Sequence, residues 1–136
     1  MTLSESIKAW IKSYPAIKLY NDFDTDRLRG EAESLGLYKQ PTNTETEFID
    51  GSKLRTDYFY LVIRQEAQEE RDRVSNQKFL EQFERWIEER NFNEDYPRGY
   101  NVEEIKIANS FYMQETDGEQ AVYQISLGVT YRKERN

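Results

Sequence analysis

The stretch that decides the fold lies near the end of the chain and reads Gln120-Ala-Val-Tyr-Gln-Ile-Ser-Leu-Gly-Val-Thr-Tyr-Arg132. Apolar and aromatic side chains fall on one side of an extended chain, at Ala121, Tyr123, Ile125, Leu127, Val129 and Tyr131. The other side is mostly polar, with Val122, Gln124, Ser126, Gly128, Thr130 and Arg132. This alternation predicts a half-buried strand that turns its apolar face toward a core.

A second alternating run just upstream predicts the partner strand of a hairpin, with a turn signal at Thr116-Asp-Gly-Glu119 between the two. A two-residue loop would mix apolar with polar residues on one face. A loop of three residues, Thr116 to Gly118, avoids this because it sets Tyr123 against Phe111, Leu127 against Ile107 and Val129 against Ile105. We therefore expect the odd-length loop, with Gly118 in the left-handed conformation and Asn109 misplaced opposite Ile125.

Composition limits the classes of function. The chain has 136 residues and a net charge of −7, which fits one domain and argues against a nucleic-acid or acidic-membrane surface. The N-terminus lacks the apolar segment of a signal peptide, and no run is long enough to span a membrane, so we expect a cytoplasmic origin. The acidic balance suits solubility, or attraction of a basic partner.

Catalytic motifs are missing from the sequence. It contains no cysteine and no histidine, which excludes disulfides, Cys/His zinc sites and imidazole-based catalysis. The 26 acidic residues lie in solvated runs, and the six glycines are isolated, so no Gly-rich phosphate loop exists. We expect a protein that is not an enzyme, with no catalytic, cofactor-binding or metal-binding residues.

The N-terminal part predicts one short helix and an acidic loop. Thr2 to Glu5 reads as a capping box, apolar residues follow at helical spacing as far as Tyr14, and Pro15 ends the helix. The acids of Asn21 to Asp26, with Glu33, match part of a calcium-binding loop. Arg27 stands where that loop needs glycine, so a solvated acidic loop is the preferred interpretation.

Strands are expected in the next segment. Ser34 to Lys39 reads as a strand ended by Gln40-Pro41, and Asp50-Gly51 as a turn. The run Arg55 to Arg64 is apolar on both faces, with Phe59, Leu61 and Ile63 on one and Tyr58, Tyr60 and Val62 on the other. Such a strand is either central in a sheet or covered by another subunit.

The predicted second helix follows a charged segment. Gln65 to Arg73 is expected to be an exposed loop, and Ser75 to be an N-cap with Val74 and Phe79 as a hydrophobic staple. The helix then runs to Arg90-Asn91, with a core-facing stripe of Phe79, Leu80, Phe83, Trp86 and Ile87. The order of elements predicts an α+β fold: a mainly antiparallel sheet of about four or five strands with two amphipathic helices on one face.

These segments, taken in order, resemble the minor capsid or tail-terminator (tail-completion) proteins of long-tailed bacteriophages. The first is the opening helix that ends in Trp10-Ile11, with Pro15 four residues on. The second is Asp50-Gly51 followed by Asp57-Tyr-Phe-Tyr-Leu-Val-Ile. The third is Asn76 and Phe79 leading to Trp86-Ile-Glu-Glu89, and later Ala121-Val-Tyr-Gln-Ile.

The resemblance implies a homo-oligomeric ring, of six copies in the family, at the head-proximal end of the tail. Such a ring stops growth of the tail tube and docks it to the head connector, so the protein would be located in the virion. Tail-tube and head-connector proteins would be its partners. Members of the family are similar in architecture rather than in catalytic residues, so the resemblance implies no site to carry over.

The residues themselves suggest where subunits would meet. The candidate interface consists of Tyr58, Tyr60, Val62, Gln124, Ser126, Thr130 and Arg132. The tyrosines could equally pack beneath a loop of their own chain. The charged segments Gln40 to Ile49 and Gln65 to Arg73 are expected to be mobile loops. They could line the ring lumen, become ordered on docking, or be ordinary solvent loops. The alternative function is a small acidic binding or inhibitory (immunity-like) protein that pairs with one basic partner.

Overall fold

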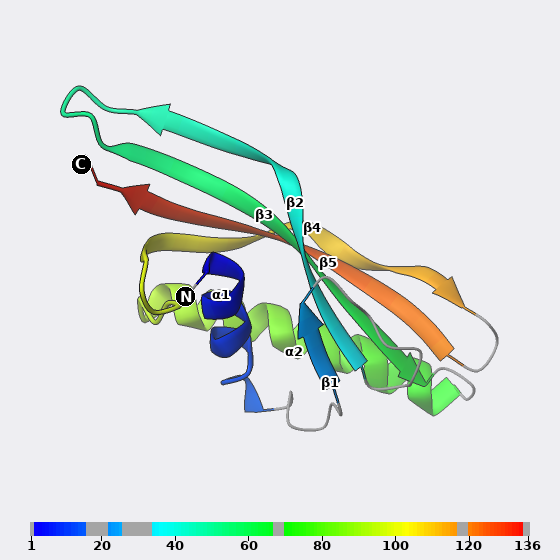
Figure 1. Cartoon of the computed structure of the whole chain (residues 1–136). Helices are drawn as coiled ribbons and strands as arrows, with labels where there is room; N and C mark the ends of the chain where they lie inside the picture. Colours follow the sequence, from blue (N-terminus) through cyan, green and yellow to red (C-terminus); the bar gives the residue numbers. More distant parts are fainter. Residues whose placement is uncertain (1, 16–21, 26–33, 67–69, 117–119, 135–136) are drawn as a thin grey trace.

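Five strands form one sheet, and both helices pack against the same face of it (Figure 1). The computed structural model describes residues 2–15, 22–25, 34–66, 70–116 and 120–134. The elements are α1 (Leu3–Ile11), β1 (Asp22–Thr25), β2 (Ser34–Glu47), β3 (Lys53–Glu66), α2 (Glu70–Phe92), β4 (Asn101–Thr116) and β5 (Gln120–Lys133). The predicted α+β class, with two helices on one face of a mainly antiparallel sheet, is confirmed.

The strands lie in the order β1-β2-β3-β5-β4. All neighbours are antiparallel except β1, which runs parallel to β2. The aromatic strand β3 is therefore central, one of the two positions expected for a strand that is apolar on both faces. The hairpin of β2 and β3 extends beyond the helices toward the upper left of Figure 1.

One hydrophobic core lies between the sheet and the helices. Its centre consists of fully buried side chains from both layers, Ile7, Ile11, Leu35, Leu37, Phe59, Leu61, Ile63, Leu80, Phe83 and Ile125. The predicted apolar face of β5 is buried throughout, from Ala121 to Tyr131. Aromatic rings join the two helices, since Trp10 of α1 lies 4.7 Å from Trp86 of α2 between ring centroids. The alternating and helical patterns thus identified the core-facing residues correctly.

The two helices begin by different means. Thr2 caps α1 as expected, because its Oγ1 accepts a 3.1 Å hydrogen bond from the backbone N–H of Glu5. The predicted start of α2 at Ser75 is wrong, since the helix begins at Glu70 and Ser75 lies inside it. Apolar spacing marks only the turns that touch the core, whereas charged helix formers extend this helix further into solvent.

Two segments expected to be loops are largely strand or helix. Strand β2 continues through Pro41 to Glu47, with a register irregularity between Lys39 and Asn43. Pro41 is tolerated because it lies in this irregular stretch, where residues 40–42 do not pair with β3, and because β1 pairs only with residues 34–37. Within the segment 65–73, Gln65 is buried in β3 and residues 70–73 belong to α2.

The prediction of an acidic loop over residues 21–26 is wrong for residues 22–25. Asp22–Thr25 is the short strand β1, which pairs with Ser34–Leu37. Backbone pairing with β2 stabilises this strand, although two of its four residues are Asp, which is depleted in strands. The other positions of the partial match to a calcium-binding loop lie outside the described residues; they are Asp26, Arg27 and Glu33.

The hairpin of β4 and β5 keeps the predicted register over its first half only. Ile105 pairs with Val129 and Ile107 with Leu127, as expected. Irregularities in β4 then shift the pairing, so that Tyr123 faces Met113 instead of Phe111 and Asn109 faces Ser126 instead of Ile125. Extra residues in a bulged strand change the register without a sequence signal. The three-residue loop is wrong because Thr116 pairs with Ala121, and Gly118 lies outside the described residues.

Candidate interaction surface

The structure brings the seven predicted interface residues together on the sheet face opposite the helices, which we call the open face. Tyr58 pairs with Gly128, Tyr60 with Ser126, and Val62 with Gln124. Paired residues share a face, and the alternate pairs, such as Phe59 with Leu127, are the ones buried beneath the helices. Thr130 and Arg132 continue the same face along β5, and the Oγ1 atoms of Thr130 and Thr56 are 2.7 Å apart.

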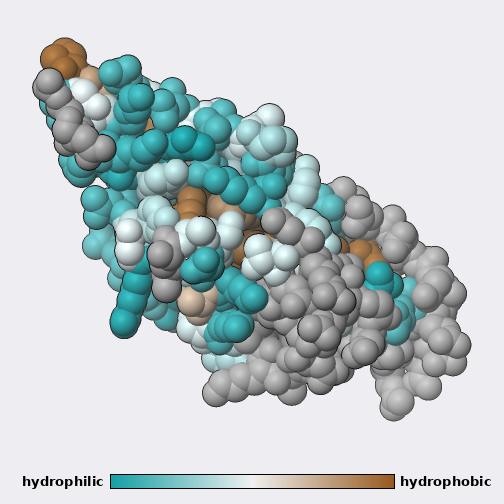
Figure 2. Space-filling model, viewed as in Figure 1, coloured by the Kyte–Doolittle hydropathy of each residue, from teal (hydrophilic) through white to brown (hydrophobic). Residues whose placement is uncertain are grey.

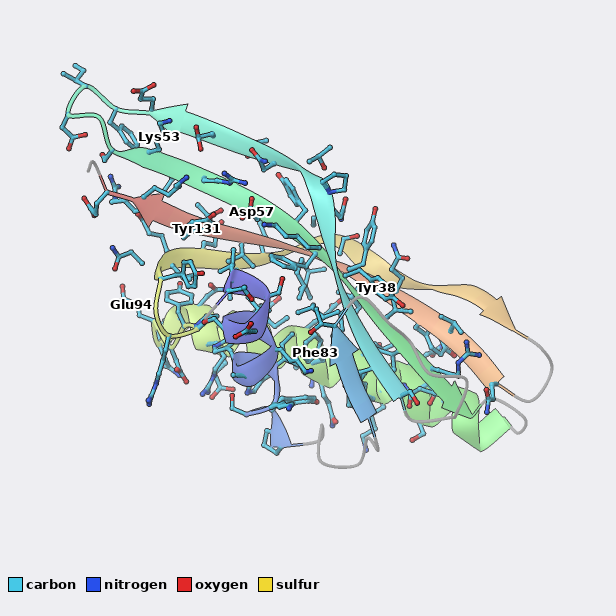
Figure 3. The ribbon with its side chains drawn as sticks, viewed as in Figure 1. Tyr38, Lys53, Asp57, Phe83, Glu94 and Tyr131 are labelled. Carbon is cyan, nitrogen blue, oxygen red and sulfur yellow. The ribbon has the colours of Figure 1, made fainter. Side chains whose placement is uncertain are left out.

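A further tyrosine on the open face was missed by the sequence analysis. Tyr38 of β2 pairs with Tyr60, and its ring is half-buried (Figure 3). The alternation of Leu35 and Leu37 would have placed Tyr38 on the polar side, but the strand was considered alone. The register of β2 against β3 makes Tyr38, Tyr58 and Tyr60 parts of one surface.

Burial on the open face is uneven. Ser126 and Val62 are only 6% and 8% exposed, although no described helix covers them. Small side chains here lie below the tyrosines: a Cβ added to Gly128 would sit 3.2 Å from Cε1 of Tyr58. The centre of this face of β5 is therefore shielded by neighbouring side chains of the sheet itself. The half-buried rings of Tyr38, Tyr58 and Tyr60 stand above these small side chains on the open face.

The turn between β2 and β3 exposes two large apolar side chains. Phe48 is 38% exposed and Ile49 is completely exposed, at 109%. The apolar area at the upper left end of Figure 2 lies at this projecting turn. The predicted Asp50-Gly51 turn is confirmed, and Gly51 has a φ of 88°, which glycine adopts without strain.

The turn has a defined geometry. The N–H of Phe48 donates to the carbonyl of Ser52 at 2.8 Å, and the N–H of Gly51 donates to the carbonyl of Phe48 at 2.9 Å. Oδ1 of Asp50 accepts from both the N–H and the hydroxyl of Ser52, which lowers the pKa of the Asp50 carboxyl. The guanidinium of Arg132 lies 5.1 Å from the centre of the Phe48 ring. These contacts hold Phe48 while Ile49 points into solvent.

A buried carboxylate lies on the helix-side face of the same hairpin. Asp57 is 2% exposed and accepts hydrogen bonds from Nε of Arg55 and from the hydroxyl of Tyr131, both at 2.9 Å. Nζ of Lys39 is 3.9 Å from the same carboxylate. Burial first, and then the hydrogen bond to Asp57, raise the pKa of Tyr131 to about 12. A phenol held neutral in this way is a structural donor and is unsuited to act as a nucleophile.

Two hollows of similar size lie beside the helices. The first, of about 390 Å³, lies between α1 and residues 95–98 and is lined by Ser6, Ala9, Trp10, Ser13, Asp95, Tyr96, Pro97 and Arg98. The second, of about 360 Å³, lies between α2 and β4 and is lined by Glu84, Ile87, Glu88, Asn91, Ile105, Lys106 and Ile107. Neither set contains paired acids in contrasting environments of the kind used for hydrolysis.

Metal binding and membrane insertion find no support in the part of the chain that the structure describes. No cluster of three or more acidic, histidine or cysteine side chains within that part is arranged to hold a metal ion. No helix there combines the length and the apolar character that crossing a membrane requires.

Comparison with known proteins does not assign the chain to a family. No family model matches the sequence, and no curated protein is significantly similar to it.

Proposed function

We propose that the protein is a structural component of a phage virion, a ring-forming tail terminator that caps the tail tube and docks it to the head connector. The observation that carries the proposal is the open face, where half-buried tyrosines lie on the side of the sheet that no helix of the described residues covers. The resemblance of its segments to tail-completion proteins supplies the type of assembly. The proposal includes no catalysed reaction.

The open face has the chemistry of a protein contact. Tyr38, Tyr58 and Tyr60 each offer a large apolar ring and a hydroxyl, and tyrosine is enriched at interfaces for this reason. The flanking Thr130 and Gln124 are half-buried and polar, which suits the rim of a contact that forms after folding. A symmetric ring can cover in each subunit a surface that one chain leaves open.

The net charge of −7 also fits a ring around passing DNA. An acidic lumen repels phosphates, so DNA would cross the ring without binding to it. Residues 40–47, expected to belong to a loop, are instead part of β2 in the projecting β2–β3 hairpin. This hairpin is therefore the candidate docking element. Its apolar tip, Phe48 and Ile49, has the exposure expected of a group that a partner buries.

The test is the molar mass of the purified protein, measured by light scattering alone and after addition of tail-tube protein, with electron microscopy of the products. We expect rings, or rings that form on tube ends and stop tube growth. The variant Tyr60→Arg should prevent assembly, because it places a charge in the middle of the open face. Gln82→Arg, on the exposed side of α2, is the matched control and should assemble normally.

A strict monomer under both conditions would refute the ring function. The alternative, an acidic inhibitory protein, predicts instead a tight 1:1 complex with one basic enzyme. Neighbouring genes separate the two, since tail and connector genes accompany the first and a toxin gene the second.

A further inference from the structure

We infer that the tip of the β2–β3 hairpin, residues 48–51, binds in the hollow between α1 and residues 95–98 of a second copy of this chain. The inference rests on the proposed ring and names one contact between its neighbouring subunits. Four observations support it: the exposure of Ile49, the rigidity of the turn, the preformed hollow and the charges around both.

The tip is a preorganised apolar group. Ile49 is 109% exposed, whereas the hydrogen bonds of Phe48, Asp50 and Ser52 fix the turn that carries it. A group already held in its bound geometry loses little conformational entropy on binding. The hairpin carries this turn beyond both helices, away from α1 of its own chain (Figure 1). A second molecule is therefore the partner that this turn can reach.

The hollow is also preformed. The indole Nε1 of Trp10 donates a 2.8 Å hydrogen bond to the carbonyl of Asp95, and the hydroxyl of Ser6 donates to the carbonyl of Arg98. These two bonds tie α1 to the loop that forms the opposite wall. The volume of 390 Å³ falls at the lower end of the range of about 300–1,000 Å³ for binding pockets, which suits a side chain or a short turn.

The lining of the hollow offers apolar surface to an aliphatic group and a positive charge to an acid. Ala9, Trp10 and Pro97 supply apolar surface, and the exposed Arg98 supplies positive charge. Asp95 is balanced by Arg90, whose Nη1 lies 3.0 Å from its Oδ2. A tip seated here brings its own acids close to Arg98.

The charge of the tip discriminates between the two hollows. The turn carries Asp50, with Glu47 just before it, so its approach is favoured toward Arg98. The hollow between α2 and β4 is lined by Glu84 and Glu88 against a single cation, Lys106, so its excess of negative charge disfavours an acidic turn. The contact joins the tip of one copy to the hollow of the next, so the two copies use different patches. Contacts of this kind form a ring when the rotation between successive copies closes.

Engineered disulfides provide a direct test, because the chain has no cysteine of its own. The variants Ile49→Cys and Ala9→Cys are purified separately, mixed at the concentration at which the protein assembles, and oxidised mildly. A disulfide needs Cα atoms within about 7 Å. We expect a cross-linked heterodimer from this mixture and at least a tenfold lower yield from Ile49→Cys mixed with Gln77→Cys, an exposed position on α2.

A second variant keeps the test independent of cysteine chemistry. Ile49→Asp leaves the folded monomer intact, because the side chain contacts only solvent, and should raise the concentration needed for self-association at least tenfold. Thr42→Asp, an exposed site on β2, is the control for added charge and should leave that concentration unchanged.

The outcomes separate this contact from the ring function. Equal yields in the two mixtures, or self-association unaffected by Ile49→Asp, while rings still form would overturn the contact and leave the ring. A cross-link between Ile49 and Ala9 positions without capping of the tail tube would support the contact and overturn the tail-terminator function.

Discussion

The hydroxyl of Tyr131 donates a 2.9 Å hydrogen bond to Oδ2 of Asp57, across two neighbouring strands in the centre of the sheet. Both side chains are buried, at 8% and 2% exposure. Arg55 and Lys39 complete the surroundings of this carboxylate. The bond joins side chains of β3 and β5 and adds to the backbone pairing between these two strands.

We predict that Tyr131→Phe destabilises the protein by about 1–3 kcal/mol, because the buried Asp57 loses a donor. Chemical unfolding measures the loss. Tyr58→Phe is a matched control, since it removes a hydroxyl from a half-buried ring on the opposite face of β3 and should cost less. An equal loss in both variants would contradict the role assigned to the Asp57 hydrogen bond.

The raised pKa of Tyr131 also predicts how the stability of the protein changes at high pH. The pKa of Tyr131 rises from 10.0 to about 12 on folding, so the fold favours the neutral phenol. The stability that this contributes is fully present below pH 10 and is lost as pH rises through about 12. The wild type should therefore lose up to about 2 kcal/mol more than Tyr131→Phe over this window. If the free energies of unfolding of the two proteins, measured with denaturant, fell in parallel between pH 10 and about 12, the assignment of the raised pKa to Tyr131 would be refuted.

Two phenylalanines on α2 should differ sharply in their contribution to stability. Phe83 is fully buried, and we expect Phe83→Ala to cost about 3–5 kcal/mol. Phe92, the last residue of the helix, is 88% exposed, and Phe92→Ala should change stability by less than about 0.5 kcal/mol. Thermal and denaturant unfolding of both variants measure the difference. Comparable costs would mean that Phe92 is covered by a partner under the conditions used.

Asn91 should protect the outer edge of β4. Its amide Nδ2 donates to the carbonyl of Ile105 and its Oδ1 accepts from the N–H of Ile105, so it pairs with the strand as another strand would. Asn91→Ala should cost about 1–3 kcal/mol, since it leaves both backbone groups without this partner. It should also promote aggregation through the opened edge. The exposed Asn93→Ala is the control, and turbidity on heating is the second readout.

Glu94, two residues beyond the end of α2, has a backbone conformation that normally selects glycine. Its φ is 54°, and the N–H of Asp95 donates to the carbonyl of Arg90 while the N–H of Glu94 donates to that of Asn91. This is the hydrogen-bond pattern of a left-handed C-terminal cap. Glu94→Gly should stabilise the protein by about 1 kcal/mol by removing strain. Glu94→Ala keeps the Cβ and should give no comparable gain, so a gain in both would point to the lost charge instead.

Local patterns in the sequence were sufficient to identify most of the core. The alternation at Leu127 and Val129 and the helical spacing at Phe83 and Ile87 correspond to buried residues, because burial on one face imposes the period of the element. The cap at Thr2 and the turn at Asp50-Gly51 were also predictable, since both depend on a few adjacent residues.

Features that depend on distant partners were not predictable in the same way. The bulges of β4 shift Tyr123 to Met113, and strand β2 continues through Pro41, which lies where residues 40–42 do not pair with β3. Residues 70–74 are helical although they show no apolar stripe. In each case the element is stabilised by backbone pairing or helix propagation rather than by a local hydrophobic period.

The sequence by itself determined the α+β class, the core-facing side of each long element and the residue types available to a site. Only the tertiary structure decided that Tyr38, Tyr58 and Tyr60 share one face, that Asp57 is buried against Tyr131, and that Ile49 stands alone at a projecting tip. The physical reason is that strand register and sheet order join residues far apart in the chain. The local periodicity of the sequence contains no information about these long-range pairings.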